Sequence, residues 1–325
     1  MKREHILEIH SLSINYHSQG KEVRAVRDLS FNLEHGETLG LVGETGAGKT
    51  TTALGIMGIL PDVTARVEGG EIIYKGEDLL KKSKAQMRAT RGKEVSMIFQ
   101  DPMTSLDPVM TVGKQIEEMI ALHSDGKREE ITKQAEHMLE VVGIRKERYH
   151  DYPHQFSGGM KQRVMIAIAL SCSPNLLIAD EPTTALDVTI QAQVLELMKN
   201  LKDQYQMSMI MITHDLGIVA EICDRVAIMY AGNVVEYGSV EAVYNHTAHP
   251  YTEALFHSLP QIDEDQEELQ VISGLPPDPT DLPSGCAFHP RCPYANAECE
   301  REMPEEYEVS PGHVSRCVRC KQEVE

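Results

Sequence analysis

The sequence predicts an α/β fold built from parallel strands and crossover helices. Residues 175–179, 207–212 and 225–229 are mostly apolar, which is typical of strands buried on both faces. Helical patterns at 188–203 and 216–223 separate these runs, and such alternation is the pattern of parallel strands joined by helices. The length of 325 residues and the apolar content of 41% suffice for one large domain with a small appendage.

The remaining elements follow from the same periodicities. A strand at 38–42 leads into a glycine-rich turn, and a helix that includes 51–60 is expected after it, ending before Pro61. Helical patterns gather between about 104 and 172, so we expect an inserted helical subdomain there. The other predicted elements are strands at 6–9, 29–33, 71–74 and 95–99 and helices at 112–123, 128–142 and 160–172.

The charge of the chain argues against a nucleic-acid partner. With 50 acidic and 31 basic side chains the formal net charge is -19, so the average surface repels phosphates. The most apolar run, residues 164–170, is far shorter than the roughly 20 residues of a membrane-spanning helix, and the first residues lack the apolar region of a signal peptide. We expect a chain that is neither exported nor embedded in a membrane, so any membrane role comes through a partner.

The composition changes after residue 245. Residues 246–283 combine a helical stretch with an acidic run and several prolines, as expected for a linker. Five of the seven cysteines crowd into residues 284–325, the cysteine-rich segment, which is too short to bury a core of its own. We therefore expect a main domain at 1–245, a linker at 246–283 and a cysteine-rich segment that either docks on the main domain or is held together by a metal.

A phosphate-binding loop is predicted at residues 43–50. Its sequence, Gly-Glu-Thr-Gly-Ala-Gly-Lys-Thr, matches G-x-x-x-x-G-K-[ST] between a strand and a helix. The glycines allow successive N–H groups to point at phosphate oxygens, and the following helix adds its positive end. Lys49 would reach the β- and γ-phosphates of ATP, and the Thr50 hydroxyl would bind Mg²⁺. The expected phosphate-binding residues are Gly43, Glu44, Thr45, Gly46, Ala47, Gly48, Lys49, Thr50 and Thr51.

Two acidic residues follow the predicted strand at 175–179. Asp180 and Glu181 are costly there unless an ion or a substrate compensates their charge, although an ordinary strand end would also explain them. Given the phosphate loop earlier in the chain, Asp180 suits Mg²⁺ binding through water, and Glu181 can orient and deprotonate the attacking water.

A third motif, Phe-Ser-Gly-Gly-Met-Lys-Gln-Arg at residues 156–163, lies between the phosphate loop and the paired carboxylates. This order of motifs resembles the ATPases of ABC transporters, and the motif is similar to their signature loop, with Met160 where many members have Gln. The resemblance implies head-to-tail dimers in which Ser157, Gly158 and Gly159 cap the γ-phosphate of ATP bound to the other subunit. A hydroxyl and glycine amides ahead of a helix suit an anion site, and Ser157 is equally an N-cap.

Further positions match the ABC family in place and type. Gln100 resembles the glutamine that touches Mg²⁺ and links the site to the helical subdomain. His214 resembles the switch histidine that senses the γ-phosphate and helps to hold Glu181, and residues 184–187 resemble the loop that crosses the dimer interface. Tyr16 is the aromatic residue expected to stack on adenine, with a place in the core as the alternative.

The resemblance covers residues 1 to about 245 and implies an ABC cassette, a P-loop NTPase with a RecA-like core and an inserted helical subdomain. The implied activity is Mg²⁺-dependent ATP hydrolysis, with Glu181, His214 and Lys49 as the catalytic residues. The implied partners are a homologous ATPase subunit in a heterodimer, two transmembrane permease subunits and, indirectly, an extracytoplasmic peptide-binding protein. The implied location is peripheral, on the cytoplasmic face of the cell membrane.

The cysteine-rich segment carries a resemblance of its own. It contains Gly-Cys at 285–286, Phe288, Pro-Arg-Cys-Pro at 290–293, Cys299 and Cys317. These residues resemble the C-terminal extension of ATP subunits from dipeptide, oligopeptide and nickel importers. We therefore expect the chain to energise the import of di- or oligopeptides, with nickel import as the alternative.

Four thiols so close in sequence can form a Cys₄ metal site, because a reducing cytosol disfavours disulfides. Zinc and an iron–sulfur cluster are both compatible with four thiolates, and the resemblance favours [4Fe-4S]. Cys320 competes with Cys317 as the fourth ligand, His289 and His313 are further zinc candidates, and a metal-free thiol-rich segment is the alternative. The expected ligands are Cys286, Cys292, Cys299 and Cys317.

Two other functions compete with transport. Soluble ABC ATPases that act on DNA or ribosomes usually carry long coiled coils or two cassettes, and this acidic sequence has neither pattern. A regulatory cassette that binds ATP without hydrolysing it would not need Glu181, His214 and a full signature loop.

Overall fold

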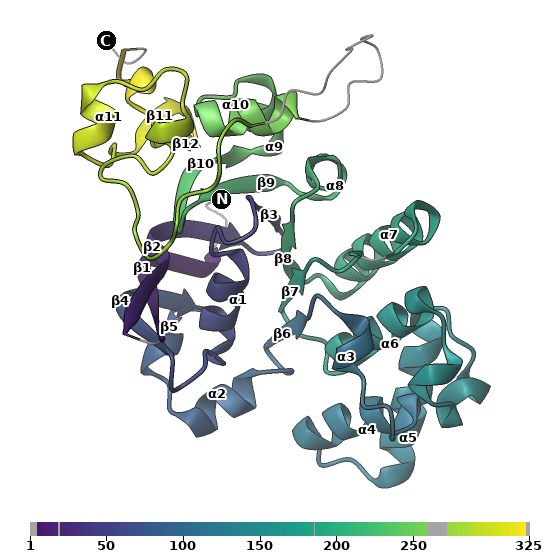
Figure 1. The fold of residues 1–325 in the computed structure, drawn as a ribbon. Coiled ribbons are helices and arrows are strands. Elements are labelled where there is room, and N and C mark those ends of the chain that lie inside the picture. Colours follow the sequence, from purple (N-terminus) through teal and green to yellow (C-terminus); the bar gives the residue numbers. More distant parts are fainter. Residues whose placement is uncertain (1–4, 19, 185, 259–271, 323–325) are drawn as a thin grey trace. The chain divides into compact units, whose positions relative to one another are not determined.

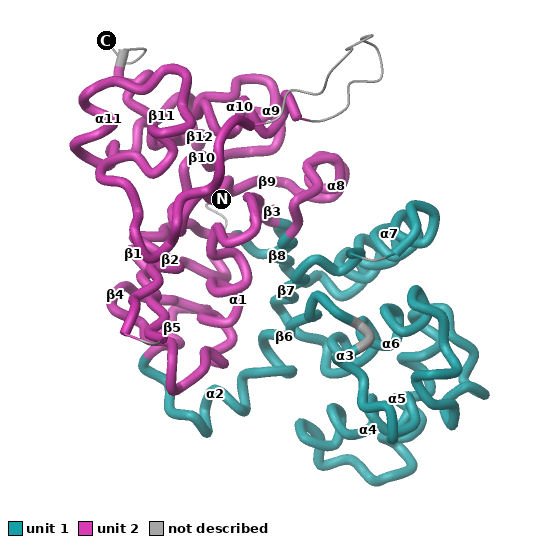
Figure 2. The backbone as a smooth tube through the Cα atoms, viewed as in Figure 1, with its two compact units in different colours: residues 1–4, 34–38, 81–212 teal, residues 5–33, 39–80, 213–325 magenta. Residues whose placement is uncertain are grey.

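The chain forms two compact units, each assembled from separate stretches of sequence (Figure 2). The first unit comprises residues 1–4, 34–38 and 81–212, and the second comprises 5–33, 39–80 and 213–325. The structure is a computed structural model that describes residues 5–18, 20–184, 186–258 and 272–322. The middle of the predicted linker, residues 259–271, therefore lies outside the described residues. Figure 1 gives the order of the elements along the chain.

The second unit contains an antiparallel sheet near the N-terminus, in the order β2-β1-β4-β5. The short strands predicted at 6–9 and 71–74 are parts of longer ones, because β1 and β4 pair in antiparallel fashion along most of their length. Alternation in β1 buries Leu7 and Ile9 and resumes with Leu12 and Ile14 after an irregularity in the pairing that follows His10. The strands are β1 (His5–Ser18), β2 (Lys21–Glu34), β4 (Ala65–Tyr74) and β5 (Glu77–Asp78).

A second group of strands carries the loop after residue 42. β3 (Thr38–Val42) is buried at every position and pairs in parallel with β9 (Arg225–Tyr230), which confirms both predicted strands. β10 (Asn233–Ser239) then pairs antiparallel with β9. The helices of this unit are α1 (Lys49–Met57), α8 (Leu216–Ile222), α9 (Val240–Asn245) and α10 (Pro250–His257). The helix α1 ends earlier than predicted because Gly58 adopts the left-handed conformation, with φ of 61°, that stops a helix.

The first unit contains the parallel strands β6 (Val95–Ile98), β7 (Leu176–Asp180) and β8 (Ser208–Thr213), paired in the order β6-β7-β8. The helix α7 (Val188–Tyr205) connects β7 to β8, as the alternating pattern predicted. Between β6 and β7 the chain is mostly helical, and α4 and α5 pack on each other and on α6. The remaining helices are α2 (Lys84–Thr90), α3 (Pro102–Ser105), α4 (Val112–His123), α5 (Arg128–Val141) and α6 (Gly158–Leu170).

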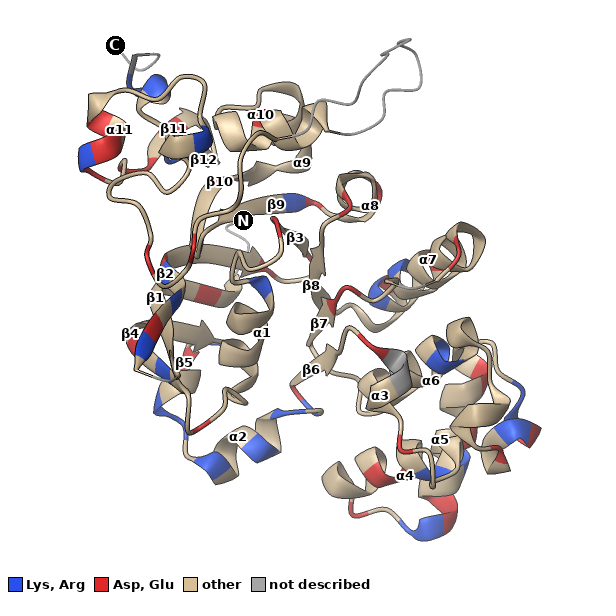
Figure 3. Cartoon of the chain, viewed as in Figure 1, with Lys and Arg blue, Asp and Glu red and all other residues tan. Residues whose placement is uncertain are grey.

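Acidic and basic residues are interspersed along both units (Figure 3), in keeping with the excess of acidic side chains in the sequence. Among the described residues, the structure contains no helix with the length and hydropathy needed to span a membrane.

The cysteine-rich segment docks on β10 by adding two strands to it. β12 (His313–Ser315) pairs antiparallel with β10, and β11 (Tyr307–Ser310) pairs with β12. Behind this pairing, His313 Nε2 lies 2.8 Å from Glu236 Oε1, and both side chains are completely buried. The Glu236 carboxylate also accepts hydrogen bonds from the N–H groups of Ala248 and His249, at 2.8 and 2.9 Å.

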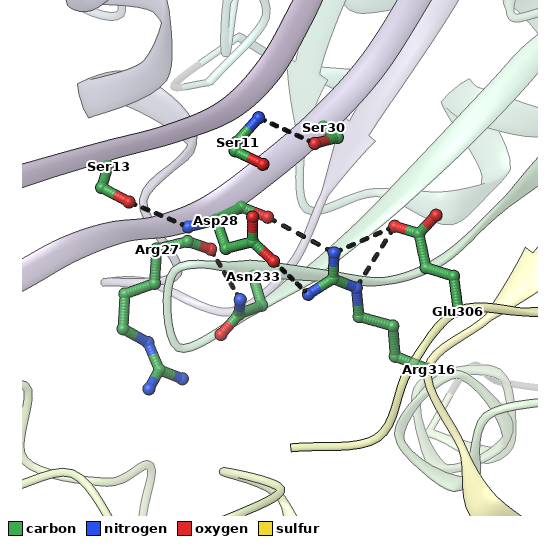
Figure 4. Close-up of polar contacts among 8 residues, drawn as sticks. All are labelled: Ser11, Ser13, Arg27, Asp28, Ser30, Asn233, Glu306 and Arg316. Carbon is green, nitrogen blue, oxygen red and sulfur yellow. Dashed lines mark hydrogen bonds and ion pairs between the residues drawn. The ribbon is translucent and has the colours of Figure 1, made fainter. Parts of the chain in front are cut away.

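A second anchor ties the segment to β2 (Figure 4). Arg316 lies 3.0 Å from carboxylate oxygens of both Asp28, on β2, and Glu306, within the segment. The linker before the segment also contacts β2, because the backbone N–H of Arg24 donates to Pro279 O at 3.2 Å. The cysteine-rich segment is thus packed against β2 and β10 of the second unit.

Glu236→Ala should destabilise the second unit strongly. The substitution leaves His313 and two backbone N–H groups buried without their acceptor, and breaking a buried pair of this kind costs roughly 3–5 kcal/mol. We expect a lower melting temperature and faster proteolysis of the cysteine-rich segment. Glu241→Ala, which removes an exposed carboxylate from α9, is the matched control and should change neither. Equal melting temperatures for the two variants would show that the buried pair does not hold the segment.

Candidate nucleotide-binding site

The phosphate loop joins β3 to α1 in the second unit, and close packing requires glycine at two of its three glycine positions. A Cβ atom at Gly43 would lie 2.2 Å from the carbonyl oxygen of Met229, and one at Gly48 would lie 2.3 Å from that of Ala25. Gly46 differs, because no atom lies within 4 Å of a Cβ built there. Gly46 and Gly48 both have left-handed φ angles, of 85° and 99°. One side of the loop therefore packs against the protein while Gly46 faces open space.

Hydrogen bonds fix the buried side of the loop. The Ala47 N–H donates to Glu44 O at 3.1 Å, and Gly232 N–H donates to Ala47 O at 3.0 Å. The Thr52 hydroxyl donates to Gly48 O at 3.0 Å. The predicted phosphate-binding residues that remain exposed are Thr45, Gly46 and Thr50. The exposed positions are those at which phosphates and Mg²⁺ can approach.

The Lys49 side chain is held within the loop. It is only 7% exposed, and its Nζ donates to Gly43 O at 2.6 Å and to Glu44 O at 3.1 Å. A buried ammonium group is costly unless it is paired, and carbonyl oxygens lower that cost. The loop therefore keeps a positive charge beside the place where the β- and γ-phosphates of a nucleotide bind.

Tyr16 lies beside the start of α1. Its hydroxyl is 3.5 Å from Thr51 Oγ1, and its side chain is only partly buried. Tyr16 is therefore not a fully buried core residue, and its ring stays a candidate for stacking on adenine.

Two residues that bind the loop were missed by the sequence analysis. Tyr251 on α10 accepts a hydrogen bond from the Glu44 N–H at 2.9 Å, and the Arg291 guanidinium binds both carboxylate oxygens of Glu44, at 2.8 and 3.1 Å. Burial raises the pKa of Tyr251, so its hydroxyl stays protonated. Tyr251 belongs to no motif, and Arg291 lies in the Pro-Arg-Cys-Pro stretch at 290–293, which by itself does not point to the phosphate loop. No periodicity connects positions so far apart in sequence.

The paired carboxylates lie at the end of β7 in the first unit. Asp180 is buried and ends the strand, whereas Glu181 has a left-handed φ of 46° that is uncommon for a residue with a side chain. Glu181 Oε2 accepts hydrogen bonds from Gln100 Nε2 at 2.9 Å and from Thr184 Oγ1 at 3.0 Å. The structure thus brings together Gln100 and Glu181, which the sequence analysis had assigned separate roles.

The signature loop lies at the start of α6 in the first unit. Ser157 Oγ accepts the N–H of Met160 at 3.4 Å, which confirms the predicted N-cap. Ser157 and Gly158 are exposed, while a Cβ at Gly159 would lie 2.4 Å from Ile190 on α7. Ser157 and the first residue of α6, Gly158, are therefore at the surface.

Two further predicted positions follow strands β7 and β8. Within the predicted interface loop at 184–187, Asp187 caps α7 by accepting the N–H of Ile190 at 3.0 Å, and Ala185 lies outside the described residues. His214 is exposed just after β8 in the second unit, where Asp215 caps α8.

The predicted cysteine ligands surround one small cavity. It has a volume of about 20 Å³, and Arg316 and Arg319 also line it. Burial raises the pKa of the Cys286 and Cys292 thiols. Across the described part of the chain, no three His, Cys, Asp or Glu side chains are grouped tightly enough to hold a single metal ion. The four thiols around the cavity are Cys286, Cys292, Cys299 and Cys317.

The alternative ligands differ from one another in their surroundings. Cys320 is buried and lines a different cavity, and its thiol lies 3.9 Å from Ala248 O. His313 is paired with Glu236, whereas His289 lines the cavity of the four thiols, with its Nδ1 3.0 Å from Cys286 O.

Comparison with known proteins first defines the class of protein to which the chain belongs. Residues 26–184 match the family model described as ABC transporter. The dimeric structure of MJ0796, a bacterial ABC transporter cassette, matches with a TM-score of 0.65 at 24% identity, covering 72% of this chain and 98% of that chain. The structure of cbiO1 from Clostridium perfringens, part of the ABC transporter complex cbiONQ, matches with a TM-score of 0.64 at 27% identity, covering 75% and 92%. The predicted P-loop ABC cassette fold is thereby confirmed.

Proteins with more similar sequences then define the group within the ABC transporter proteins. The chain is 48% identical to the probable peptide ABC transporter ATP-binding protein y4tR of Sinorhizobium fredii, over 99% of this chain and 97% of that protein. It is 47% identical to the dipeptide transport protein DppD and 49% to the oligopeptide transport protein OppD of Bacillus subtilis, over 97% and 95% of this chain and 94% and 87% of those proteins. Residues 235–299 match the model described as Oligopeptide/dipeptide transporter, C-terminal region.

The chain therefore belongs to the ABC transporter ATP-binding proteins, in the dipeptide and oligopeptide transport family. ABC ATP-binding proteins are ATPases that bind ATP with Mg²⁺, so the predicted enzyme class and nucleotide are confirmed.

Proposed function

We propose that this chain hydrolyses ATP to energise the import of di- or oligopeptides across the cell membrane. The observation that carries the proposal is similarity over nearly the whole chain, cysteine-rich segment included, to proteins named for dipeptide and oligopeptide transport. The chain works as a peripheral subunit on the cytoplasmic face of the membrane, and other subunits select the cargo.

The phosphate loop binds the triphosphate through backbone N–H groups around Gly46 and through Lys49. The open space at Gly46 and the Lys49 ammonium held beside it support this assignment. Thr50 and Gln100 bind Mg²⁺, with Asp180 acting on the ion through water. Tyr16 stacks on the adenine ring.

Glu181 orients the attacking water and takes its proton, and His214 senses the γ-phosphate. The hydrogen bonds from Gln100 and Thr184 support this role, because they fix the carboxylate without neutralising it. The left-handed backbone at Glu181 also supports it, since strain of this kind collects at functional sites.

The partners complete the site and use its energy. A homologous ATPase subunit pairs head to tail with this chain, so that Ser157, Gly158 and Gly159 cap ATP bound to the partner. The exposure of Ser157 and Gly158 supports this arrangement. Two permease subunits dock on a helical subdomain at 104–172, near Gln100.

Glu181→Gln should abolish turnover and preserve ATP binding. The amide keeps the shape and hydrogen bonds of the side chain but cannot accept the proton of water, and a general base contributes on the order of 10²- to 10⁴-fold. We expect kcat of the assembled complex to fall by at least about 100-fold with little change in the Kd of ATP. Glu196→Gln, an exposed carboxylate on α7, serves as the control. Undiminished hydrolysis by the Glu181 variant would remove Glu181 from the mechanism.

We further propose that the cysteine-rich segment holds a metal centre, a [4Fe-4S] cluster with zinc as the alternative. Four thiols line one cavity, three of them buried and that of Cys292 partly exposed, and this arrangement favours such a centre. Arg319, which also lines the cavity, would offset its negative charge. A zinc ion needs its thiolates about 2.3 Å away on all sides. The cavity of about 20 Å³ is little larger than the site of one water, so the thiols would have to move to hold either group. The preference for the cluster rests on the resemblance of the segment to the extension of peptide-importer subunits. The bound centre would cross-link a segment that lacks its own core.

Metal analysis of the full chain, purified without oxygen, should find iron and acid-labile sulfide in similar amounts. Cys317→Ser should lose them, and Cys320→Ser should retain them, because Cys317 lines the cavity and Cys320 does not. If the analysis finds zinc and no acid-labile sulfide, the centre is a zinc site and not an iron–sulfur cluster. Absence of both metals from the intact wild-type chain would contradict the proposed centre.

A further inference from the structure

Glu44 poses an electrostatic problem for a phosphate-binding loop. It is the one acidic residue among positions 43–50, which otherwise carry no negative side chain. A carboxylate so close to a triphosphate repels it, and the repulsion grows where water is excluded. The loop can tolerate Glu44 only if its charge is compensated and its side chain is held in a fixed place.

Arg291, from the cysteine-rich segment, meets both requirements. Its NH1 and NH2 groups donate to Glu44 Oε2 and Oε1 at 2.8 and 3.1 Å, the two-pronged geometry that guanidinium and carboxylate groups prefer. The rest of the guanidinium is also engaged, because Nε donates to Ser273 O at 3.1 Å and NH1 to Tyr230 Oη at 3.2 Å. The Arg291 side chain is only 5% exposed, so this ion pair is shielded from solvent on the arginine side.

An aromatic cluster fixes the backbone of Glu44 from the same side. The rings of Tyr230, Tyr251 and Phe288 pack with centroids 4.6, 5.2 and 5.4 Å apart, and Tyr251 is completely buried. The Tyr251 hydroxyl accepts the Glu44 N–H at 2.9 Å. Strand β9, helix α10 and the cysteine-rich segment thus meet at one loop residue.

Glu44 connects this cluster to the phosphate-binding lysine. Its carbonyl oxygen accepts a hydrogen bond from Lys49 Nζ at 3.1 Å, so its N–H, carboxylate and carbonyl groups are all bound. We propose that Arg291 is a positioning residue of the nucleotide site: it neutralises Glu44 and fixes the start of the phosphate loop, and so makes ATP affinity depend on the cysteine-rich segment. This inference rests on the ATP site of the proposed function.

Arg316 offers a control that distinguishes an effect of Arg291 on the nucleotide site from mere attachment of the cysteine-rich segment. Like Arg291, it is an arginine of the cysteine-rich segment that binds a carboxylate of the main domain, here Asp28 on β2 (Figure 4). Its side-chain hydrogen bonds go to Asp28 and Glu306, and its backbone N–H donates to Val235 O at 2.8 Å. None of these described contacts is with the phosphate loop. If Arg291 merely attached the segment, loss of either arginine would affect ATP in the same way.

The test measures the Kd of ATP by calorimetry on the full chain without Mg²⁺, so that no turnover occurs. We expect Arg291→Ala to weaken binding about tenfold, because Glu44 keeps its charge without its counter-charge. The Kd of Arg291→Lys should lie between those of the wild type and Arg291→Ala, since lysine keeps the charge but not the paired hydrogen bonds. The double variant Arg291→Ala with Glu44→Gln should recover most of the affinity, and Arg316→Ala should bind as the wild type does.

Three results would overturn the inference: an unchanged Kd for Arg291→Ala, no recovery in the double variant, or an equal loss in Arg316→Ala. Failure of the wild-type chain to bind ATP would be a different outcome, because it would contradict the proposed function itself. Melting temperatures of all variants identify any that fail to fold, and the double variant decides the matter if Arg291→Ala alone is unstable.

Discussion

The shape of the phosphate loop depends on contacts with distant parts of the chain. Its inner face is pressed against the carbonyl groups of Ala25 and Met229, at distances that leave no room for a Cβ atom at Gly43 or Gly48. Within that constraint the backbone turns back on itself, and the carbonyl oxygens of Gly43 and Glu44 accept hydrogen bonds from the Lys49 ammonium group. The fold of the second unit therefore sets the geometry of the loop before any nucleotide arrives, which lowers the ordering cost of binding.

The cysteine-rich segment enters this arrangement through charge and hydrogen bonding. It is tied to β10 by strand pairing and by the buried Glu236–His313 contact, and to the phosphate loop by Arg291. Coupling between two sites is reciprocal. If the Arg291 contact strengthens ATP binding by some free energy, then bound ATP strengthens the contact of the segment with the phosphate loop by the same free energy. A segment without a core of its own is thereby linked to the activity of the cassette.

The sequence predicted those features that local patterns encode. The phosphate loop, the parallel strands β7 and β8 and the Ser157 N-cap follow from short motifs and from runs of apolar residues, because each is determined by neighbours in sequence. The antiparallel additions β11 and β12 were missed, since both are short and only partly apolar. The contacts of Arg291 and Tyr251 with Glu44 span more than two hundred residues, and no spacing rule reaches that far.

The most direct test of this coupling is hydrogen–deuterium exchange of the full chain with and without ATP. We predict that ATP slows exchange in two separate stretches, residues 43–51 and the part of the cysteine-rich segment around Phe288 and Arg291, and that Arg291→Ala abolishes the second effect. Protection confined to the phosphate loop in the wild-type chain would contradict the coupling.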